Sequence, residues 1–346
     1  MLMPEVHQAT ILVADNLEAY RSLLNDLLEE QGYKVVCAVD GEDALNILRS
    51  QTIDVALLDV MIPSRAGFAV CRAIKSDPKT CLIPVVLVTG LNNIEDRIQG
   101  IDCGADDFIS KPVNKEELLA RVRSLLRLKH LTDEMEHAET VLFSLAFSIE
   151  AKNAYTEGHG QRLSMYSVAL GARRGLPEEQ REALRRGGIL HDIGKVAVPE
   201  QILLKSGPLT PEEREIMEQH TVVGERICSP LKSFRMVLPI IRHHHEKLDG
   251  SGYPDGLKNG AIPLTAKILQ TVDVYDALTT HRPYRKALSR AAAFQQIREE
   301  VRRGWWDGAL VDEFEDLLVR AHFTLGKRAK ETAQRESGKC IPSKKN

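Results

Sequence analysis

Five short apolar runs alternate with helix-like segments over the first part of this 346-residue chain. The runs, rich in valine, leucine and isoleucine, lie at residues 11–14, 35–36, 55–58, 85–88 and 108–109. Segments with apolar residues at helical spacing follow at 17–30, 41–50, 66–76, 93–102 and 114–128. Short continuous apolar strands that alternate with helices indicate a parallel sheet covered on both faces. We therefore predict an α/β doubly wound domain with five parallel strands over residues 8–128.

Polar side chains follow several of these strands, at the end where function is concentrated in such sheets. They are Asp15 and Asn16 after the first strand, Asp59 after the third, Thr89 after the fourth and Lys111 after the fifth. Two carboxylates, a hydroxyl and a lysine at one edge would form a magnesium site with an acceptor carboxylate and a neutralising cation. The residues alone also allow a plainer interpretation, in which Asp59 is a strand-end carboxylate and Lys111 is its ion-pair partner.

The motifs around these residues resemble a response-regulator receiver domain. They are Asp15, Asp59 within LLDVMIP, Gly67, Thr89 and the pair Lys111-Pro112. The resemblance implies a flavodoxin-like fold that binds Mg²⁺ and in which Asp59 accepts phosphate from a cognate sensor histidine kinase. It also implies that Thr89 and Lys111 contact the phosphoryl group.

One position departs from the pattern of that family, which usually has two adjacent acids after the first strand. Here the second of them is Asn16. An amide oxygen coordinates Mg²⁺ but brings no charge to a hard cation that prefers carboxylates. We therefore expect weaker Mg²⁺ binding, and weaker phosphorylation of Asp59, than is usual. Phe108 stands where the family often carries an aromatic residue that reorients on phosphorylation, and a plain core phenylalanine is an equal alternative.

A helical pattern continues from this domain into the rest of the chain. Over residues 114–150 the apolar residues are spaced mainly by threes, fours and sevens, without glycine or proline. We predict a connecting signalling helix, either one long helix or two in sequence. Lys129 and Thr132 interrupt the apolar seam, so a homodimer formed through this helix and a helix packed on the second domain both remain open. A rigid connection would carry a charge change at Asp59 to the second domain.

Residues 140–330 have helical patterns almost throughout, with clear helix starts. Proline stands at a first helical position in LPEE at 176–179 and in TPEE at 210–213, where Thr210 and Glu213 form a capping box. Residues of metal-ligand type lie within or at the ends of these helices, and we place His220 on the helix that Thr210 caps. They are His159, His191, Asp192, His220, the run His243-His244-His245, Asp273 and Asp276.

His191 and Asp192 emerge from the apolar pair Ile189-Leu190, and a buried imidazole and carboxylate need a partner. Taken singly, each ligand-type residue has a plain alternative, such as a hydrogen-bonded core histidine, a solvated histidine run or a helix-capping acid. Taken together they would need many separate partners, whereas a two-metal centre bridged by Asp192 would satisfy them all. Such a histidine-rich, cysteine-free site suits Fe, Mn, Ni or Zn, and ligand type alone does not choose among them. We expect Fe or Mn, with Ni or Zn as alternatives.

Three longer motifs resemble the HD-GYP subgroup of the HD phosphohydrolases, all-α helical bundles that linearise cyclic di-GMP. The motifs are HDIGK at 191–195, HHEKLDGSGYP at 244–254 and VDVYDALTTHRPYR at 272–285. The metal ligands that the resemblance implies are His159, His191, Asp192, His220, His244, His245 and Asp273. It further implies catalytic roles for Asp192 and for Lys195, which would stabilise the scissile phosphate. The substrate contacts would be Tyr253, Arg282 and Arg285.

The number of metals follows from one further comparison with that subgroup. Some members hold a third metal with the help of a glutamate four residues before the first histidine ligand. That residue is Tyr155 here, so we predict two metals. His243 and His281 are expected to be structural.

Composition excludes several other classes of function. A net charge of −3 offers no general attraction to DNA or RNA, and no apolar run approaches the ~20 residues of a membrane span. The N-terminal residues lack the pattern of a signal peptide, so we expect a cytoplasmic protein. Six scattered cysteines indicate reduced thiols. Residues 331–346 are expected to form a solvated, disordered tail.

The leading interpretation is a two-component response regulator whose output is metal-dependent hydrolysis of cyclic di-GMP to pGpG, GMP or both, controlled by phosphorylation of Asp59. The main alternative is a non-catalytic module that retains its metal site for cyclic-dinucleotide binding or protein docking. A different cyclic dinucleotide as substrate is a further alternative, because the Gly-Tyr-Pro motif is not a physical readout of guanine.

Overall fold

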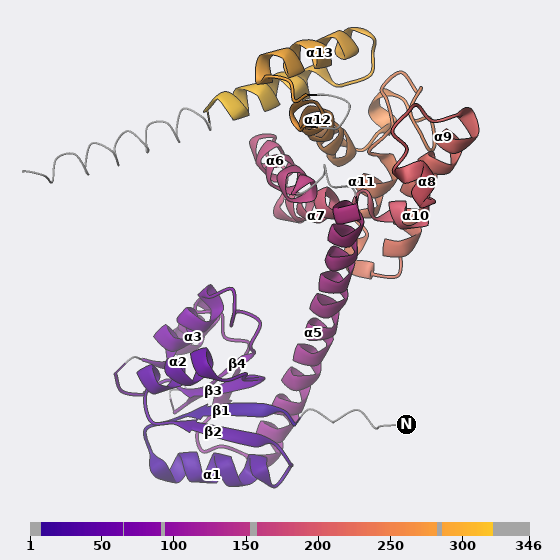
Figure 1. Ribbon diagram of the computed structural model, residues 1–346. Helices are drawn as coiled ribbons and strands as arrows, with labels where there is room; N and C mark the ends of the chain where they lie inside the picture. The colour runs from indigo at the N-terminus through magenta and orange to yellow at the C-terminus, as the bar shows by residue number, and fades with distance from the viewer. Residues whose placement is uncertain (1–7, 65, 91–93, 153–157, 282–285, 321–346) are drawn as a thin grey trace, which may run out of the picture. The chain divides into compact units, whose positions relative to one another are not determined.

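A computed structural model of the chain describes residues 8–64, 66–90, 94–152, 158–281 and 286–320. The chain divides between Glu139 and Thr140 into two compact units (Figure 1). The division lies inside helix α5 (Lys115–Lys152), so this single uninterrupted helix begins in the first unit and ends in the second. None of the described helices combines the length and the apolar character that a membrane crossing needs.

The first unit is a parallel sheet with helices between its strands (Figure 1). Its elements are β1 (Thr10–Ala14), α1 (Glu18–Glu29), β2 (Lys34–Ala38), α2 (Gly41–Ser50), β3 (Val55–Asp59), α3 (Gly67–Ser76), β4 (Val85–Thr89), α4 (Ile94–Asp102) and β5 (Asp107–Ser110). The strand order is β2-β1-β3-β4-β5, and every neighbouring pair is parallel. The predicted five-stranded doubly wound fold is confirmed.

Both faces of this sheet are buried, because successive side chains of a strand point to opposite faces. Leu12 and Leu58 pack with apolar residues of α2 and α3. Val13 and Leu57 pack on the other face with apolar residues of α1 and of the first turns of α5. Two covered faces explain why the strands are continuous apolar runs and not alternating patterns. The polar residues that end these strands are therefore collected at the carboxyl edge of the sheet.

The second unit is helical in all of its described elements. They are the end of α5, α6 (His159–Arg173), α7 (Glu178–Leu190), α8 (Glu200–Leu203), α9 (Pro211–Glu218), α10 (His220–Cys228), α11 (Leu238–His243), α12 (Leu264–Thr279) and α13 (Arg290–Arg302), with 3₁₀ turns η1 (Ile193–Ala197), η2 (Lys232–Phe234) and η3 (Asn259–Ala261). One apolar core joins α6, α7, α11, α12 and α13. The predicted all-α bundle is confirmed.

Glycines let two pairs of these elements approach closely. A Cβ on Gly188 of α7 would lie 2.4 Å from the backbone nitrogen of Ser164 in α6. A Cβ on Gly194 of η1 would lie 1.8 Å from the carbonyl oxygen of His220, the first residue of α10. These backbone contacts hold the elements that carry His159, His191 and His220 against one another.

The helix that Thr210 caps differs from the prediction. Thr210 forms the expected capping box with Glu213, but the helix is α9 and ends at Glu218. His220 begins the next helix, α10, so the prediction that Thr210 caps the helix of His220 is wrong. The interruption has a local cause, because the carbonyl oxygen of Met217 accepts a hydrogen bond from Nδ1 of the His220 ring at 2.6 Å.

Candidate phosphorylation site and metal centre

The polar residues of the first unit meet at the carboxyl edge of the sheet, as its topology requires. The ammonium group of Lys111 lies 2.6 Å from Oδ2 of Asp15 and 3.1 Å from Oδ2 of Asp59. Both carboxylates and Thr89 are buried, whereas Asn16 is exposed. Burial opposes the charge on Lys111, but its bonds to the two carboxylates outweigh that effect and raise its pKa. Two carboxylates thus share one cation and keep a net negative charge, beside an exposed amide.

Phe108 is half-buried next to this edge and packs against the core on the α2–α3 side of the sheet. Its ring occupies the space above Gly100 of α4, where an added Cβ would lie 2.3 Å from the ring. Whether this ring reorients on phosphorylation stays a prediction.

In the second unit, five of the predicted histidine ligands gather in one place. Neighbouring ring centroids lie 5.3 Å apart for His159 and His191, 5.0 Å for His191 and His244, and 5.2 Å for His220 and His245. The rings come from the starts of α6 and α10 and from the residues just after α7 and α11. Residues separated by up to 86 positions of sequence are thus brought together, 86 being the difference between 159 and 245.

Four of the imidazoles are held in the same way, through Nδ1. The Nδ1 atoms of His191, His220 and His244 bind the backbone carbonyl oxygens three residues earlier, at 3.1, 2.6 and 2.8 Å. Nδ1 of His159 binds the carboxylate of Asp276 at 2.8 Å. An acceptor at Nδ1 favours the tautomer whose proton is on Nδ1 and leaves the lone pair of Nε2 for a metal.

Two ligand groups share one carboxylate. Asp192, His220, His244 and His245 form one group, and His159, His191 and Asp192 form the other, each with ligand atoms within 4.8 Å of one another. Nε2 of His191 and Oδ1 of Asp192 are buried and have no hydrogen-bond partner among the described residues. Buried polar atoms without such a partner are costly. The donor set therefore fits two divalent metals with Asp192 between them.

Two aspartates of α12 lie beside the ring of His159, and Asp276 holds it through Nδ1. Asp276 is buried and also accepts hydrogen bonds from Nε and Nη2 of Arg162, at 2.6 and 2.9 Å. On the opposite side of the ring, Nε2 of His159 lies 3.4 Å from Oδ1 of Asp273. The structure thus places Asp273 beside His159, on the side where a metal would bind.

The electrostatics of the cluster keep most imidazoles neutral, which is the form that binds metals. Burial lowers the pKa of His220 to about 4 and holds the pKa values of His244 and His245 well below the ordinary value. Burial also opposes the charged form of His191, but the carboxylate of Asp192 outweighs it and raises the pKa of that imidazole. Burial likewise disfavours the charge on Asp192, yet Lys195 and His191 hold its pKa well below the usual range.

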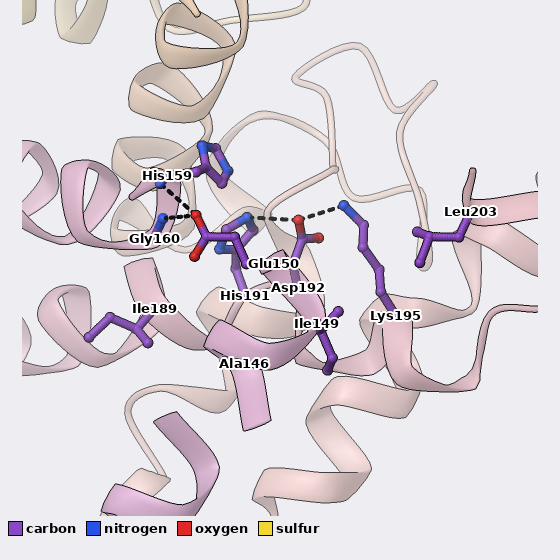
Figure 2. Close-up of a pocket in the computed structure, with 10 residues that line it drawn as sticks. All are labelled: Ala146, Ile149, Glu150, His159, Gly160, Ile189, His191, Asp192, Lys195 and Leu203. Carbon is purple, nitrogen blue, oxygen red and sulfur yellow. Dashed lines mark hydrogen bonds and ion pairs between the residues drawn. The ribbon is translucent and has the colours of Figure 1, made fainter. Parts of the chain in front are cut away.

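A small cavity of about 50 Å³ opens beside these groups, lined by Glu150, His159, His191, Asp192 and Lys195 among others (Figure 2). The ammonium group of Lys195 lies 2.5 Å from Oδ2 of Asp192, at the edge of the cavity. A cation and a carboxylate that share this cavity place a positive charge beside the candidate metal centre.

Tyr253 reaches the opposite side of the cluster. Its ring centroid lies 4.9 Å from that of His245 and 6.2 Å from that of His220. Burial raises the pKa of its hydroxyl, so this group stays neutral near pH 7. The predicted substrate contacts Arg282 and Arg285, like Tyr155, lie outside the described residues.

The segment at 247–258 that carries Tyr253, which we call the GYP loop, is organised by a buried glutamate. Glu246 is fully buried and accepts hydrogen bonds from the backbone N–H groups of Asp255 and Leu257, at 2.7 and 2.9 Å. His243 binds Oδ2 of Asp255 at 3.0 Å, which fits the structural role expected for it. The chain around Gly252 also touches Glu246, because a Cβ there would lie 2.4 Å from its Cα.

Sequence reasoning missed three residues that support the site, namely Arg162, Glu150 and Glu246. Arg162 stands three positions after His159, so helical spacing alone would have placed it on the same face. Glu246 directly follows the histidine run, which was a weaker signal. Glu150 gave none, because its partner is the backbone of a helix that begins nine residues later.

Comparisons with known proteins agree with this geometry. A family model described as the response regulator receiver domain matches residues 11–123, and one described as the HD domain matches residues 145–310. A Vibrio cholerae protein named probable cyclic di-GMP phosphodiesterase is 34% identical, over 91% of this chain and 79% of its own length. The chain therefore belongs to the response regulators that join a receiver domain to an HD domain.

Two further relatives carry more specific names. The cyclic di-GMP phosphodiesterase response regulator RpfG of Xanthomonas campestris is 32% identical, over 83% of this chain and 82% of its own length. The 3'3'-cGAMP-specific phosphodiesterase 3 of Vibrio cholerae is 36% identical, over 50% of this chain and 37% of its own length. These relatives thus differ in the cyclic dinucleotide that their names give.

Proposed function

We propose that the chain is a metal-dependent phosphodiesterase of the HD-GYP type that hydrolyses cyclic di-GMP under the control of phosphorylation at Asp59. The observation that carries this proposal is the membership of Asp192 in two ligand groups at once. A carboxylate with two oxygens can bridge two cations, and two-metal centres of this kind hydrolyse phosphodiesters. The relatives named as cyclic di-GMP phosphodiesterases support the choice of substrate.

The ligand residues would hold two divalent ions, with Fe or Mn before Ni or Zn. Such ions, when bound, generate a nucleophile from water and neutralise charge on the phosphodiester. Lys195 would then be available for the phosphate, because metal binding competes for the Asp192 carboxylate that now holds its ammonium group. Lys195 would stabilise the negative charge that develops on the phosphoryl oxygens during hydrolysis.

Substrate would be oriented by the GYP loop. The neutral hydroxyl of Tyr253 can donate a hydrogen bond to a phosphate or a base, and its ring offers an apolar surface. Arg282 and Arg285 carry the charge and the planar donors that suit phosphate recognition. These three contacts remain proposals that mutation of each residue would test.

Regulation would begin at the carboxyl edge of the sheet. A sensor histidine kinase would transfer phosphate to Asp59, with Mg²⁺ held by Asp15, Asp59 and Asn16 and with Thr89 and Lys111 on the phosphoryl oxygens. The added charge would act on α5, which follows this site in the chain. A homodimer through α5 would place the exposed apolar residues Leu128, Leu131 and Met135 in an interface, and it stays a proposal.

The decisive experiment is turnover of cyclic di-GMP by the full-length protein loaded anaerobically with Fe²⁺ or Mn²⁺. Release of pGpG or GMP, separated by liquid chromatography, is expected from wild type and from Asp59→Ala, with altered regulation in the latter. Asp192→Ala should abolish turnover, because it removes a ligand from both groups. Wild-type protein that binds cyclic di-GMP without releasing either product would support the non-catalytic alternative.

A second substrate is favoured by one specific observation. One relative that matches half of this chain is named as a phosphodiesterase specific for 3'3'-cGAMP. Competition between cyclic di-GMP and 3'3'-cGAMP at equal concentrations would decide between them. We expect a higher kcat/KM for cyclic di-GMP, and the opposite ranking would reassign the substrate while leaving the reaction unchanged.

A further inference from the structure

Glu150 connects the last turn of α5 to the first turn of α6 (Figure 2). Its Oε1 atom accepts hydrogen bonds from the backbone N–H groups of His159 at 2.5 Å and Gly160 at 3.3 Å. The first N–H groups of a helix have no acceptor within the helix. Gly158, at the N-cap position of α6, has no side chain that could supply one. Glu150 therefore does the work of an N-cap side chain, but from a different helix.

The first turn of α6 is closely packed against its neighbours. A Cβ added to Gly160 would lie 3.3 Å from the Cα of Ile189 in α7 and 3.5 Å from Oε2 of Glu150. The turn thus lies against both α5 and α7. The ring of His159 is held separately by Asp276, so its backbone and its side chain have different anchors.

We propose that Glu150 is a positioning residue of the metal centre. Metal binding at the position formed by His159, His191 and Asp192 then depends on where the last turn of α5 lies. The proposal rests on the two-metal centre of the proposed function. Helix shifts in switching proteins are about 1–2 Å, and N–H···O hydrogen bonds are lost soon after about 3.2 Å. A shift of that size would release the turn that carries His159.

The other ligand group provides an internal reference. Asp192, His220, His244 and His245 lie after α7, on α10 and after α11, and none of them lies on α6. This group should keep its affinity when α5 moves. Since α5 runs without interruption from Lys115, a structural change near the phosphorylation site has a continuous helix along which to reach Glu150.

The test is a titration of the full-length protein, freed of transition metals, with Mn²⁺ in excess Mg²⁺, which fills the carboxylate site of the receiver domain. The electron paramagnetic resonance signal of free Mn²⁺ reports each binding event. Glu150→Met keeps the length of the side chain and suits a helix, but it accepts no strong hydrogen bond. Glu150→Gln keeps an acceptor oxygen and loses the charge. Glu134→Met is the matched control, because Glu134 lies on the same helix and is exposed, and it forms an ion pair with His130.

Wild type and Glu134→Met should bind two equivalents with the same affinities. In Glu150→Met one of the two affinities should fall by about 10–100-fold, the range found when residues that orient ligands are replaced. In Glu150→Gln the same affinity should fall by only about fivefold, the difference between a charged and a neutral acceptor. Two wild-type affinities in Glu150→Met would overturn the proposal. If circular dichroism shows that Glu150→Met is unfolded, unchanged affinities in Glu150→Gln would overturn it equally.

The outcome is separate from that of the proposed function. Manganese titration requires no turnover, so a folded protein that binds two equivalents but does not hydrolyse cyclic di-GMP would refute the substrate and leave this test intact. A wild type that binds only one equivalent would refute the two-metal centre and this proposal together. Phosphorylation of the wild type with acetyl phosphate should change the same Mn²⁺ affinity that falls in Glu150→Met, and an identical titration curve would show that α5 does not act on the site.

Discussion

Replacing Gly194 by alanine tests whether backbone contact between η1 and α10 builds the metal centre. The added Cβ would lie 1.8 Å from the carbonyl oxygen of His220 and 2.5 Å from the backbone nitrogen of Gly224. Neither neighbour is a side chain that could rotate away. To bring the added Cβ to van der Waals distance from these backbone atoms, η1 and α10 would have to move apart by more than 1 Å. Overpacking costs about 1–3 kcal/mol where side chains can adjust, and we expect about 3 kcal/mol or more here.

For a unit of this size, about 3 kcal/mol corresponds to a fall in Tm of about 6–12 °C. The melting temperature of the second unit is measured by calorimetry, and bound Mn²⁺ by elemental analysis, which should fall because His220 is displaced. Gly207→Ala is the matched control, since a Cβ there meets no atom within 4 Å and the backbone is not left-handed. A Gly194→Ala protein with wild-type Tm and two bound metals would refute the reasoning.

Three further predictions concern other parts of the molecule. Asp276→Asn removes one of the acceptors shared by Arg162 and His159, so the Mn²⁺ affinity of the position that includes His159 should fall by about 10–100-fold in the same titration. Asn16→Asp restores a charged ligand, and intact-mass measurement should show phosphorylation of Asp59 by acetyl phosphate at lower Mg²⁺ than in wild type; an unchanged Mg²⁺ requirement would contradict the role given to Asn16. Glu246→Gln turns an amide donor toward a backbone N–H of the GYP loop, which costs about 1–3 kcal/mol, so KM for cyclic di-GMP should rise while bound Mn²⁺ stays at two equivalents.

The fold was largely predictable because both domains follow local rules. Continuous runs such as 55–58 and 85–88 require a sheet buried on both faces, and the structure shows those faces covered. The start of α9 at Pro211 was signalled by proline at the first helical position and by the capping box of Thr210. The start of α7 was predicted one residue early, because Pro177 is the N-cap and the helix begins at Glu178. The break between α9 and α10 was missed because it depends on a ring nitrogen of His220 that binds a backbone carbonyl. Helix propensities of single residues do not include a bond of this kind.

The candidate metal ligands were predicted by resemblance, and the structure supplies the physical reason that they lie together. Gly188 and Gly194 permit helix contacts that sequence spacing does not reveal. The roles of Glu150 and Glu246 could not be predicted, because each acts on backbone N–H groups, which every residue possesses. From sequence, Asp276 could have been a metal ligand or a helix-capping acid. Its bonds to His159 and Arg162 indicate instead a carboxylate that orients the His159 ring.

The middle of α5 lies outside every apolar core of the described chain. The cores of the first unit end at Leu126, and that of the second begins at Leu142. Between them the helix is supported by its own backbone bonds and by local ion pairs such as Lys129 with Asp133, and a segment of that length is marginal in water without packing. Within α5, trypsin should therefore cut first near Arg127 and Lys129. The cut would leave one fragment that still accepts phosphate and one that still binds manganese, and phosphorylation of the first could no longer change metal binding by the second.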